Sequence, residues 1–180
     1  GFRILDAAAM FAFLFAGLLL PIFSKMIKNN ESLGEMIKLS FSLLIIPAVT
    51  LWIVSLFYNY DLISLMYEEH IEYSSRVYKI LITGFIFIST SYIFGTLLTA
   101  NGSLKALNIL ASVTVILNIG LNLLLIPKYN AMGAAIASIS SQGFYVVLQV
   151  IISKKMFRLK TNLKLIFRLL LFVALTFLFA

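Results

Sequence analysis

Long uncharged runs alternate with short polar segments along the whole chain. Each run is close to the ~20 residues that a helix needs to cross the hydrocarbon core of a membrane. The complete runs cover roughly residues 4–24, 39–60, 80–100, 106–127 and 132–153, and a further run begins near Leu165. The pattern predicts an all-α, polytopic transmembrane helix bundle of about five complete spans plus a truncated sixth.

Two polar segments and one proline add detail to this prediction. Residues 25–38 form a polar loop with room for a short interfacial helix after Asn30. Residues 61–79 form the longest polar connection, which we expect to rest on the membrane surface. Pro47 lies in the middle of the second run and predicts a bend there.

Small residues recur every four positions in two of the runs, a spacing that favours close helix packing in membranes. They are Ser91, Gly95 and Thr99 in the third run, and Gly133, Ala137 and Ser141 in the fifth.

The composition agrees with a membrane protein. Of the 180 residues, 62% are hydrophobic and 12% are charged, whereas a soluble domain has about 25% charged residues. The absence of cysteine excludes disulfides, thiolate metal sites and a cysteine nucleophile. The net charge of +7 lies in short segments between apolar runs, so it indicates membrane orientation and not binding to nucleic acid.

Lysine and arginine are unevenly shared between alternate loops. The first, third and fifth loops hold Lys25, Lys28, Lys38, Lys105, Lys154, Lys155, Arg158, Lys160 and Lys164, whereas the second and fourth hold Arg76, Lys79 and Lys128. The positive-inside rule therefore predicts that the odd-numbered loops are cytoplasmic.

Catalytic and cofactor motifs are absent from the sequence. It contains no GxxxxGK[ST], GxGxxG, HExxH or GxSxG pattern. The single histidine, His70, has Glu68, Glu69 and Glu72 nearby, but this set does not close a coordination sphere, and a solvated acidic loop is the better interpretation. We expect no enzymatic activity, no metal site and no cofactor.

Polar residues inside the spans are the informative ones. Thr114, Asn118 and Asn122 are four residues apart and share one helix face. They could line a wet central cavity, or they could form hydrogen bonds between helices, worth ~0.6 kcal/mol each; both interpretations stay open. Gln142 and Gln149 on the fifth span are interpreted as packing amides.

Arg3 and Asp6 are opposite charges three residues apart at the start of the first span. They could form a substrate-anion contact beside a proton or cation site. Alternatively, both lie at the outer interface and reach water. The interfacial interpretation is favoured for Arg3, whereas Asp6, one turn deeper, is the better candidate for a functional charge.

The stretch from residue 97 to residue 137 resembles the C-terminal half of Wzx-type polysaccharide flippases of the MOP superfamily. The resemblance is carried by LLTANG at 97–102, LNIGLNLLLIPKY at 117–129 and MGAAIA at 132–137. In the family the position after the tyrosine is often Gly, and Asn130, which stands there, tolerates a left-handed turn. The first span also resembles the second helix of the family's C-terminal lobe.

If the resemblance holds, residues 1–180 are a single transmembrane domain, a fragment of a longer chain, with a polysaccharide biosynthesis C-terminal-like region at about 39–164. The family's two six-helix lobes form a V around a cavity that opens alternately to each side. They flip a lipid-linked oligosaccharide across the cytoplasmic membrane, so the implied partners are the bilayer, a polyprenyl-diphosphate-linked oligosaccharide and the missing N-terminal lobe.

The resemblance implies a substrate path of polar and charged residues. The residues expected there are Arg3, Asp6, Lys105, Asn118 and Asn122. Two alternatives are a MATE-like cation-coupled multidrug exporter, for which Asp6 would supply the acidic cavity residue, and a non-transporting membrane scaffold, in which the amides only pack.

Overall fold

The described part of the chain is a bundle of helices. The computed structural model describes the chain except residues 1, 66–68, 160–166, 168–170 and 175–180, and it gives the backbone alone at residues 2–9, 11 and 12. In order, the elements are α1 (Phe2–Lys28), α2 (Gly34–Phe57), α3 (Asn59–Ser64), α4 (Ile71–Ala100), α5 (Leu104–Tyr129) and α6 (Ala131–Phe157). No strand occurs among the described residues, so the all-α prediction is confirmed for them.

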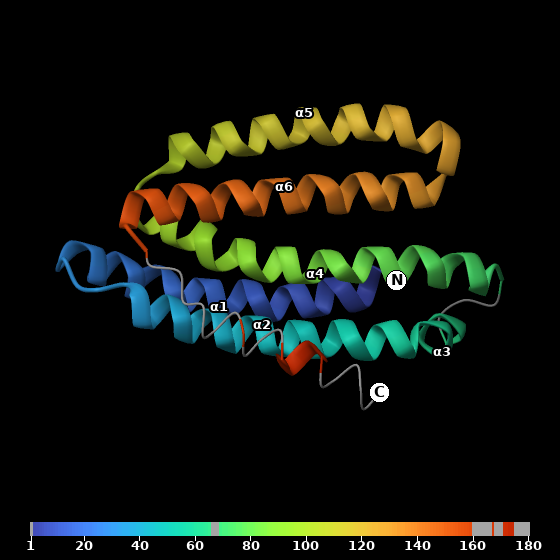
Figure 1. Ribbon diagram of the computed structural model, residues 1–180, viewed down its shortest axis with the longest axis horizontal. Coiled ribbons are helices and arrows are strands. Elements are labelled where there is room, and N and C mark those ends of the chain that lie inside the picture. The colour runs from blue at the N-terminus through green and yellow to red at the C-terminus, as the bar shows by residue number, and fades with distance from the viewer. Residues whose placement is uncertain (1, 66–68, 160–166, 168–170, 175–180) are drawn as a thin grey trace.

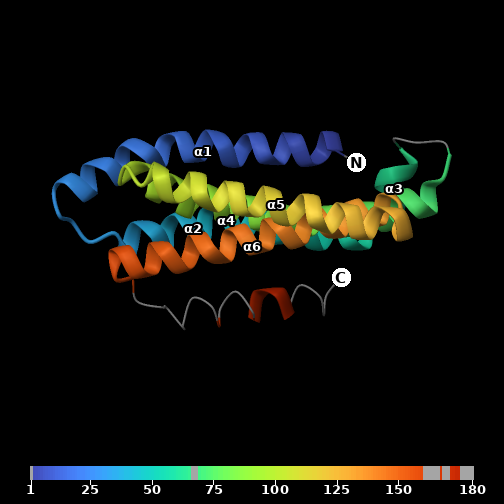
Figure 2. The same ribbon diagram turned by 90° about the horizontal axis from the view of Figure 1, so that it is seen from above.

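The long helices run back and forth along one axis, and α4 lies at their centre (Figures 1 and 2). α4 packs against α1, α2, α3 and α6, whereas α5 packs mainly against α6. The order across the bundle in Figure 1 is therefore α5, α6, α4, and then α1 and α2. α5 forms an edge of this arrangement.

Helices α2, α4, α5 and α6 are long and apolar enough to cross a membrane. The protein is thus a membrane-embedded helical bundle. The first predicted span coincides with α1, a helix of 27 residues. Most of the predicted sixth span lies outside the described residues.

The longest predicted loop is largely helical, which corrects the sequence-based expectation. α3 occupies residues 59–64, and α4 begins at Ile71, inside the polar segment. Polar and charged residues need not end a helix: Glu72 and Arg76 are one turn apart, 3.5 Å from carboxylate to guanidinium, and such pairs support it. α4 has 30 residues, so at 1.5 Å each it measures about 45 Å and exceeds the hydrocarbon core.

The first loop is also shorter than expected. α1 continues through Pro21 to Lys28, and α2 begins at Gly34, so the interfacial helix expected after Asn30 is instead the first turns of α2. α2 runs without a break through Pro47.

The core has one cluster near each end of α4. Leu19 and Phe23 of α1 and Leu44 of α2 meet Ile93 and Leu97 of α4 in the first cluster. These five side chains are 3% exposed or less, which makes α4 the element that joins α1 to α2.

The second cluster lies where α2, α3 and α4 meet, and it includes Ile63, Tyr78 and Ile82. Two hydrogen bonds between α2 and α4 flank it. Tyr78 donates to Ser55 Oγ, and Trp52 Nε1 donates to Thr83 Oγ1, each at 3.0 Å. The buried hydroxyls of Tyr78 and Ser55 therefore pair with each other across the two helices.

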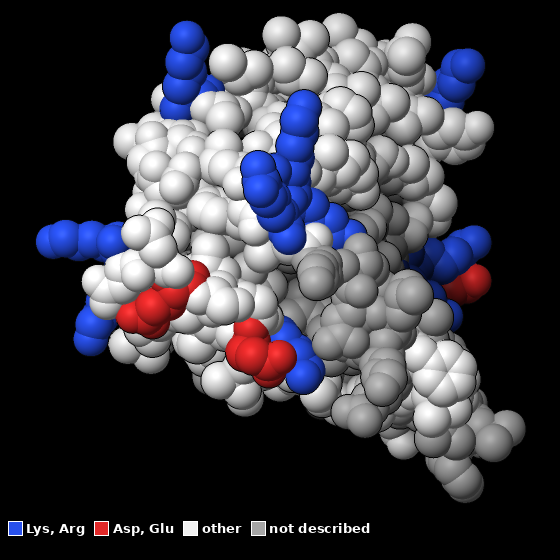
Figure 3. Space-filling view, turned by 60° about the vertical axis from the view of Figure 1, so that its left-hand side comes forward, with Lys and Arg blue, Asp and Glu red and all other residues white. Residues whose placement is uncertain are grey.

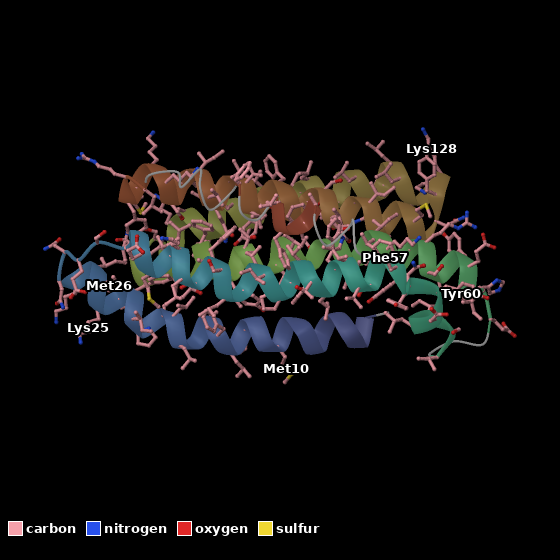
Figure 4. The ribbon with its side chains drawn as sticks, turned by 60° about the horizontal axis from the view of Figure 1, so that its bottom comes forward. Met10, Lys25, Met26, Phe57, Tyr60 and Lys128 are labelled. Atoms are coloured by element: carbon pink, nitrogen blue, oxygen red, sulfur yellow. The ribbon has the colours of Figure 1, made fainter. Side chains whose placement is uncertain are left out.

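The two ends of the bundle differ in charge. The described cations at the end where α1 leads to α2 are Lys25, Lys28, Lys38, Lys105, Lys154, Lys155 and Arg158, beside Glu31 and Glu35. The described charges at the opposite end are Arg76, Lys79 and Lys128, beside Asp61, Glu69 and Glu72. Figure 3 shows the first end, with more blue than red atoms, and Figure 4 places Lys25 and Lys128 at opposite ends. We call the first of these the basic end.

Candidate functional site

The polar residues predicted on α5 lie on the side of this helix that faces α6. Of the residues of α5, all of which the structure describes, only Leu110 is buried. Apolar side chains such as Ile116 and Leu123 are 70% and 72% exposed. Asn118 and Asn122 are half-buried by comparison. The amides thus lie at the contact between the two helices, and the apolar face points outward.

The two asparagines form a chain of hydrogen bonds that ends on α6. Asn122 Nδ2 donates to the Asn118 side-chain and main-chain oxygens, at 2.9 Å each. Asn118 Nδ2 donates to Ser141 Oγ at 3.1 Å, and Ser141 Oγ donates to the Ala137 carbonyl at 2.7 Å. We call these four residues the asparagine ladder.

The ladder satisfies most of the polar groups that it contains. Thr114, the third predicted residue, does not join it, because its hydroxyl donates to the Leu110 carbonyl at 2.8 Å. Asn122 Oδ1 accepts no hydrogen bond from any described residue. The hydrogen bonds between helices, one of the two interpretations left open by the sequence, are therefore formed, and Asn122 Oδ1 remains able to accept one from a hydroxyl group.

Asn130, in the turn between α5 and α6, has an unusual backbone conformation. Asn130 has φ 52° and ψ −130°, a positive-φ conformation outside the left-handed helical region that asparagine tolerates. Glycine adopts this conformation readily, because it has no Cβ.

Gly133 allows α6 to approach the backbone of α5 closely. A Cβ on Gly133 would contact the Leu125 carbonyl oxygen and would lie 2.6 Å from its carbon and 3.0 Å from the Ile126 nitrogen. Because these are backbone atoms, no side-chain rotation relieves the clash. The buried residues Gly133, Ala137 and Ser141 confirm the small packing face predicted for this span, and its partner is α5.

A tyrosine from α4 links the same turn to the rest of the bundle. Tyr73 Oη accepts from the Met132 N–H at 3.3 Å and donates to the Tyr129 carbonyl at 3.4 Å. Sequence reasoning missed this contact, because Tyr73 belonged to the segment expected to be a surface loop.

The predicted packing amides lie between α4 and α6. A Cβ on Gly84 would lie 2.8 Å from Gln142 Oε1, and one on Gly95 would lie 3.0 Å from Gln149 Nε2. The two glycines are eleven residues apart, or about three turns, so they share a helix face. We call the two positions where Gly84 and Gly95 make room for the glutamine amides the glycine notches. The spacing of the two glycines is a signal from which these notches could have been found.

The remaining predicted site residues lie apart from the ladder. Lys105 is exposed in the first turn of α5, at the basic end and 13 residues before Asn118, or about 20 Å along the helix. Arg3 and Asp6 lie in the first turns of α1, which packs against α4, and their side chains are outside the described residues. The structure therefore brings Asn118 and Asn122 together and does not bring Lys105 to them.

Comparisons of the chain with family models, with curated proteins and with solved structures find no match.

Proposed function

We propose that the chain is one lobe of a transporter that flips lipid-linked oligosaccharides across the cytoplasmic membrane by alternating access. The observation that carries the proposal is the α5–α6 hairpin, where the residues of the flippase resemblance meet. Gly133 and the backbone of Leu125 and Ile126, all within the segments that carry that resemblance, form the close contact between α5 and α6. The hairpin thus gives these residues a shared structural role, which supports the resemblance.

The proposed substrate path is lined by Arg3, Asp6, Lys105, Asn118 and Asn122. An amide oxygen such as Asn122 Oδ1 accepts hydrogen bonds from sugar hydroxyls, and a lysine or arginine attracts a diphosphate. In this proposal the exposed face of α5 borders lipid and a second lobe of the same chain. The positive-inside rule assigns the basic end to the cytoplasm.

Deletion of the gene in the cells that express it tests the proposal. We expect lipid-linked oligosaccharide to accumulate at the cytoplasmic face and surface polysaccharide to be lost, both measured by extraction and glycan analysis. Unchanged surface polysaccharide together with new drug sensitivity would instead favour a cation-coupled drug exporter.

A second candidate function, a non-transporting membrane scaffold, is favoured by the asparagine ladder. Its amide donors already bond within the bundle, as packing groups do. The variant N118L separates the two candidates. Lost export at normal protein level supports the transporter, whereas unchanged export at normal level supports the scaffold. The matched control is N108L, a substitution at an exposed position of the same helix.

A further inference from the structure

Two polar side chains of α6 are completely enclosed within the bundle. Gln149 is 1% exposed and Ser153 is 0% exposed. They are four residues apart, so they lie on the same face of the helix, one turn from each other. Gly95 of α4 faces Gln149 across the interface.

Each of these side chains has an oxygen without a hydrogen-bond partner among the described residues, Gln149 Oε1 and Ser153 Oγ. The Gln149 side chain also lies beside Tyr145, one turn earlier on the same helix.

Ser153 differs from three other helical hydroxyls of the bundle, and it resembles Ser89, whose buried Oγ also lacks a partner among the described residues. The hydroxyls of Ser40, Thr114 and Ser141 donate to the carbonyl oxygen four residues earlier, at 2.7–2.8 Å. Ser153 Oγ forms no such bond with a described residue. Its proton is therefore available to another acceptor.

Gln149 and Ser153 are both buried residues of α6, one turn apart on the same face. Helical residues four apart have Cβ atoms about 5–6 Å from each other, a separation that a single bound water spans. The Gln149 amide lies beside Gly95, with Nε2 3.0 Å from where a Cβ of that residue would stand. Buried polar groups in proteins are generally paired with protein or ordered water, since leaving one unpaired costs free energy.

We propose that Gln149 and Ser153 form an internal hydration site between α4 and α6. The ligand is a small neutral hydrogen-bond donor, water, which donates to Gln149 Oε1 and accepts from Ser153 Oγ. A hard cation does not fit, because it needs more oxygen ligands, carboxylates among them. The described carboxylates are all exposed: Glu31, Glu35, Asp61, Glu69 and Glu72.

The hydration site lies near the basic end of the bundle. Ser153 is four residues before Phe157, the last residue of α6, which corresponds to roughly 6 Å. We expect this water to exchange with solvent through the basic end, which is the nearer end of α6. The site does not depend on transport, so it stands apart from the proposed function.

Water-edited solid-state NMR of the full chain in lipid detects the water directly. The chain has two glutamines, Gln142 and Gln149, so selective ¹⁵N labelling gives two side-chain amide signals, which Q149L assigns. We expect magnetisation transfer from water to the Gln149 amide and its loss in S153V. No transfer to Gln149 in the unaltered protein would overturn the proposal.

The effect of S153A on the unfolding equilibrium gives an independent test, because its expected direction differs between a hydrated and a dry interface. In a hydrated site, S153A removes a partner of the water, so the unfolding equilibrium constant in mixed micelles rises roughly threefold to tenfold. In a dry interface, S153A removes an unpaired hydroxyl, so the constant stays the same or falls. That result would overturn the proposal. The matched control is S40A, which removes a fully buried serine whose hydroxyl bonds to the Met36 carbonyl.

Discussion

The two sides of α6 handle polar groups in opposite ways. On the side that faces α5, Asn122 donates a hydrogen bond to Asn118, and Asn118 donates one to Ser141. Ser141 in turn donates to the backbone carbonyl of Ala137. Toward α4, Gln142 and Gln149 fill glycine notches, and each leaves its amide oxygen unpaired by described residues. The same helix thus carries one paired and one unpaired polar face.

The two contacts also differ in what limits the approach of the helices. On the α5 side, Gly133 faces backbone atoms of Leu125 and Ile126, which cannot move aside. On the α4 side, Gly84 and Gly95 face the ends of flexible glutamine side chains. We infer that the α5–α6 contact tolerates little change in spacing, whereas the α4–α6 contact can adjust through side-chain rotation.

The largest effect is expected from G133A, which tests the rigid side of this comparison. The added Cβ meets backbone, so the helices must separate, at a cost of about 2–3 kcal/mol. Unfolding by SDS in mixed micelles, followed by fluorescence of the single tryptophan, Trp52, measures the change.

The matched control for G133A is G120A. Gly120 is an exposed helical glycine with nothing within 4 Å of an added Cβ. Alanine has the higher helix propensity, so this variant should be more stable by roughly 0.5–1 kcal/mol. Equal effects of both substitutions would mean that Gly133 is not held against α5.

The next largest effect is expected from N118L, which interrupts the asparagine ladder. It removes the bond to Ser141 and the side-chain acceptor of Asn122, whereas the main-chain acceptor remains. We therefore expect a loss of about 1–1.7 kcal/mol, near the upper limit for such contacts in membranes. The same unfolding assay measures it. N108L, at an exposed position of the same helix, should leave the stability nearly unchanged.

A smaller loss is expected from G95A on the adjustable side. Its Cβ meets the Gln149 amide at 3.0 Å, and the amide can shift, so the cost should be about 1 kcal/mol. In a Q149A background the cost should disappear, which a double-mutant cycle detects. A loss as large as that of G133A would erase the distinction between the two sides.

A gain in stability is expected from N130G in the α5–α6 turn. The positive φ of 52° with ψ −130° strains asparagine but not glycine. Relief of this strain, less the greater chain entropy of glycine, leaves a gain of about 0.5 kcal/mol, measured as a higher midpoint of unfolding. A lower midpoint would contradict the strained conformation.

The sequence predicted the helices better than their ends. Apolar runs of membrane length gave the fourth and fifth spans nearly as the structure has them, because burial in hydrocarbon requires uncharged residues. The start of α4 was predicted nine residues too late. Glu72, Arg76 and Lys79 signal where the hydrocarbon ends, but the helix continues beyond it, supported by its own ion pair.

The candidate site was predictable only within a helix. The spacing of Asn118 and Asn122 implies their mutual contact, since residues four apart meet on a helix surface. Their partner Ser141 depends on how α5 and α6 are aligned, which the turn at Asn130 and the close contact at Gly133 determine. Likewise, the spacing of Gly84 and Gly95 marks one face of α4, but the contact of this face with Gln142 and Gln149 depends on how α4 and α6 are aligned.

The central place of α4 has a consequence for how the protein is made. During translation, α1 and α2 are synthesised before α4. Leu19 and Phe23 therefore have no contact with Ile93 and Leu97, the α4 residues of their cluster, until α4 has been inserted. Insertion of α4 is the moment at which the two earlier helices acquire a common core. A nascent chain halted before that moment would offer loosely joined helices to the proteases that survey the membrane.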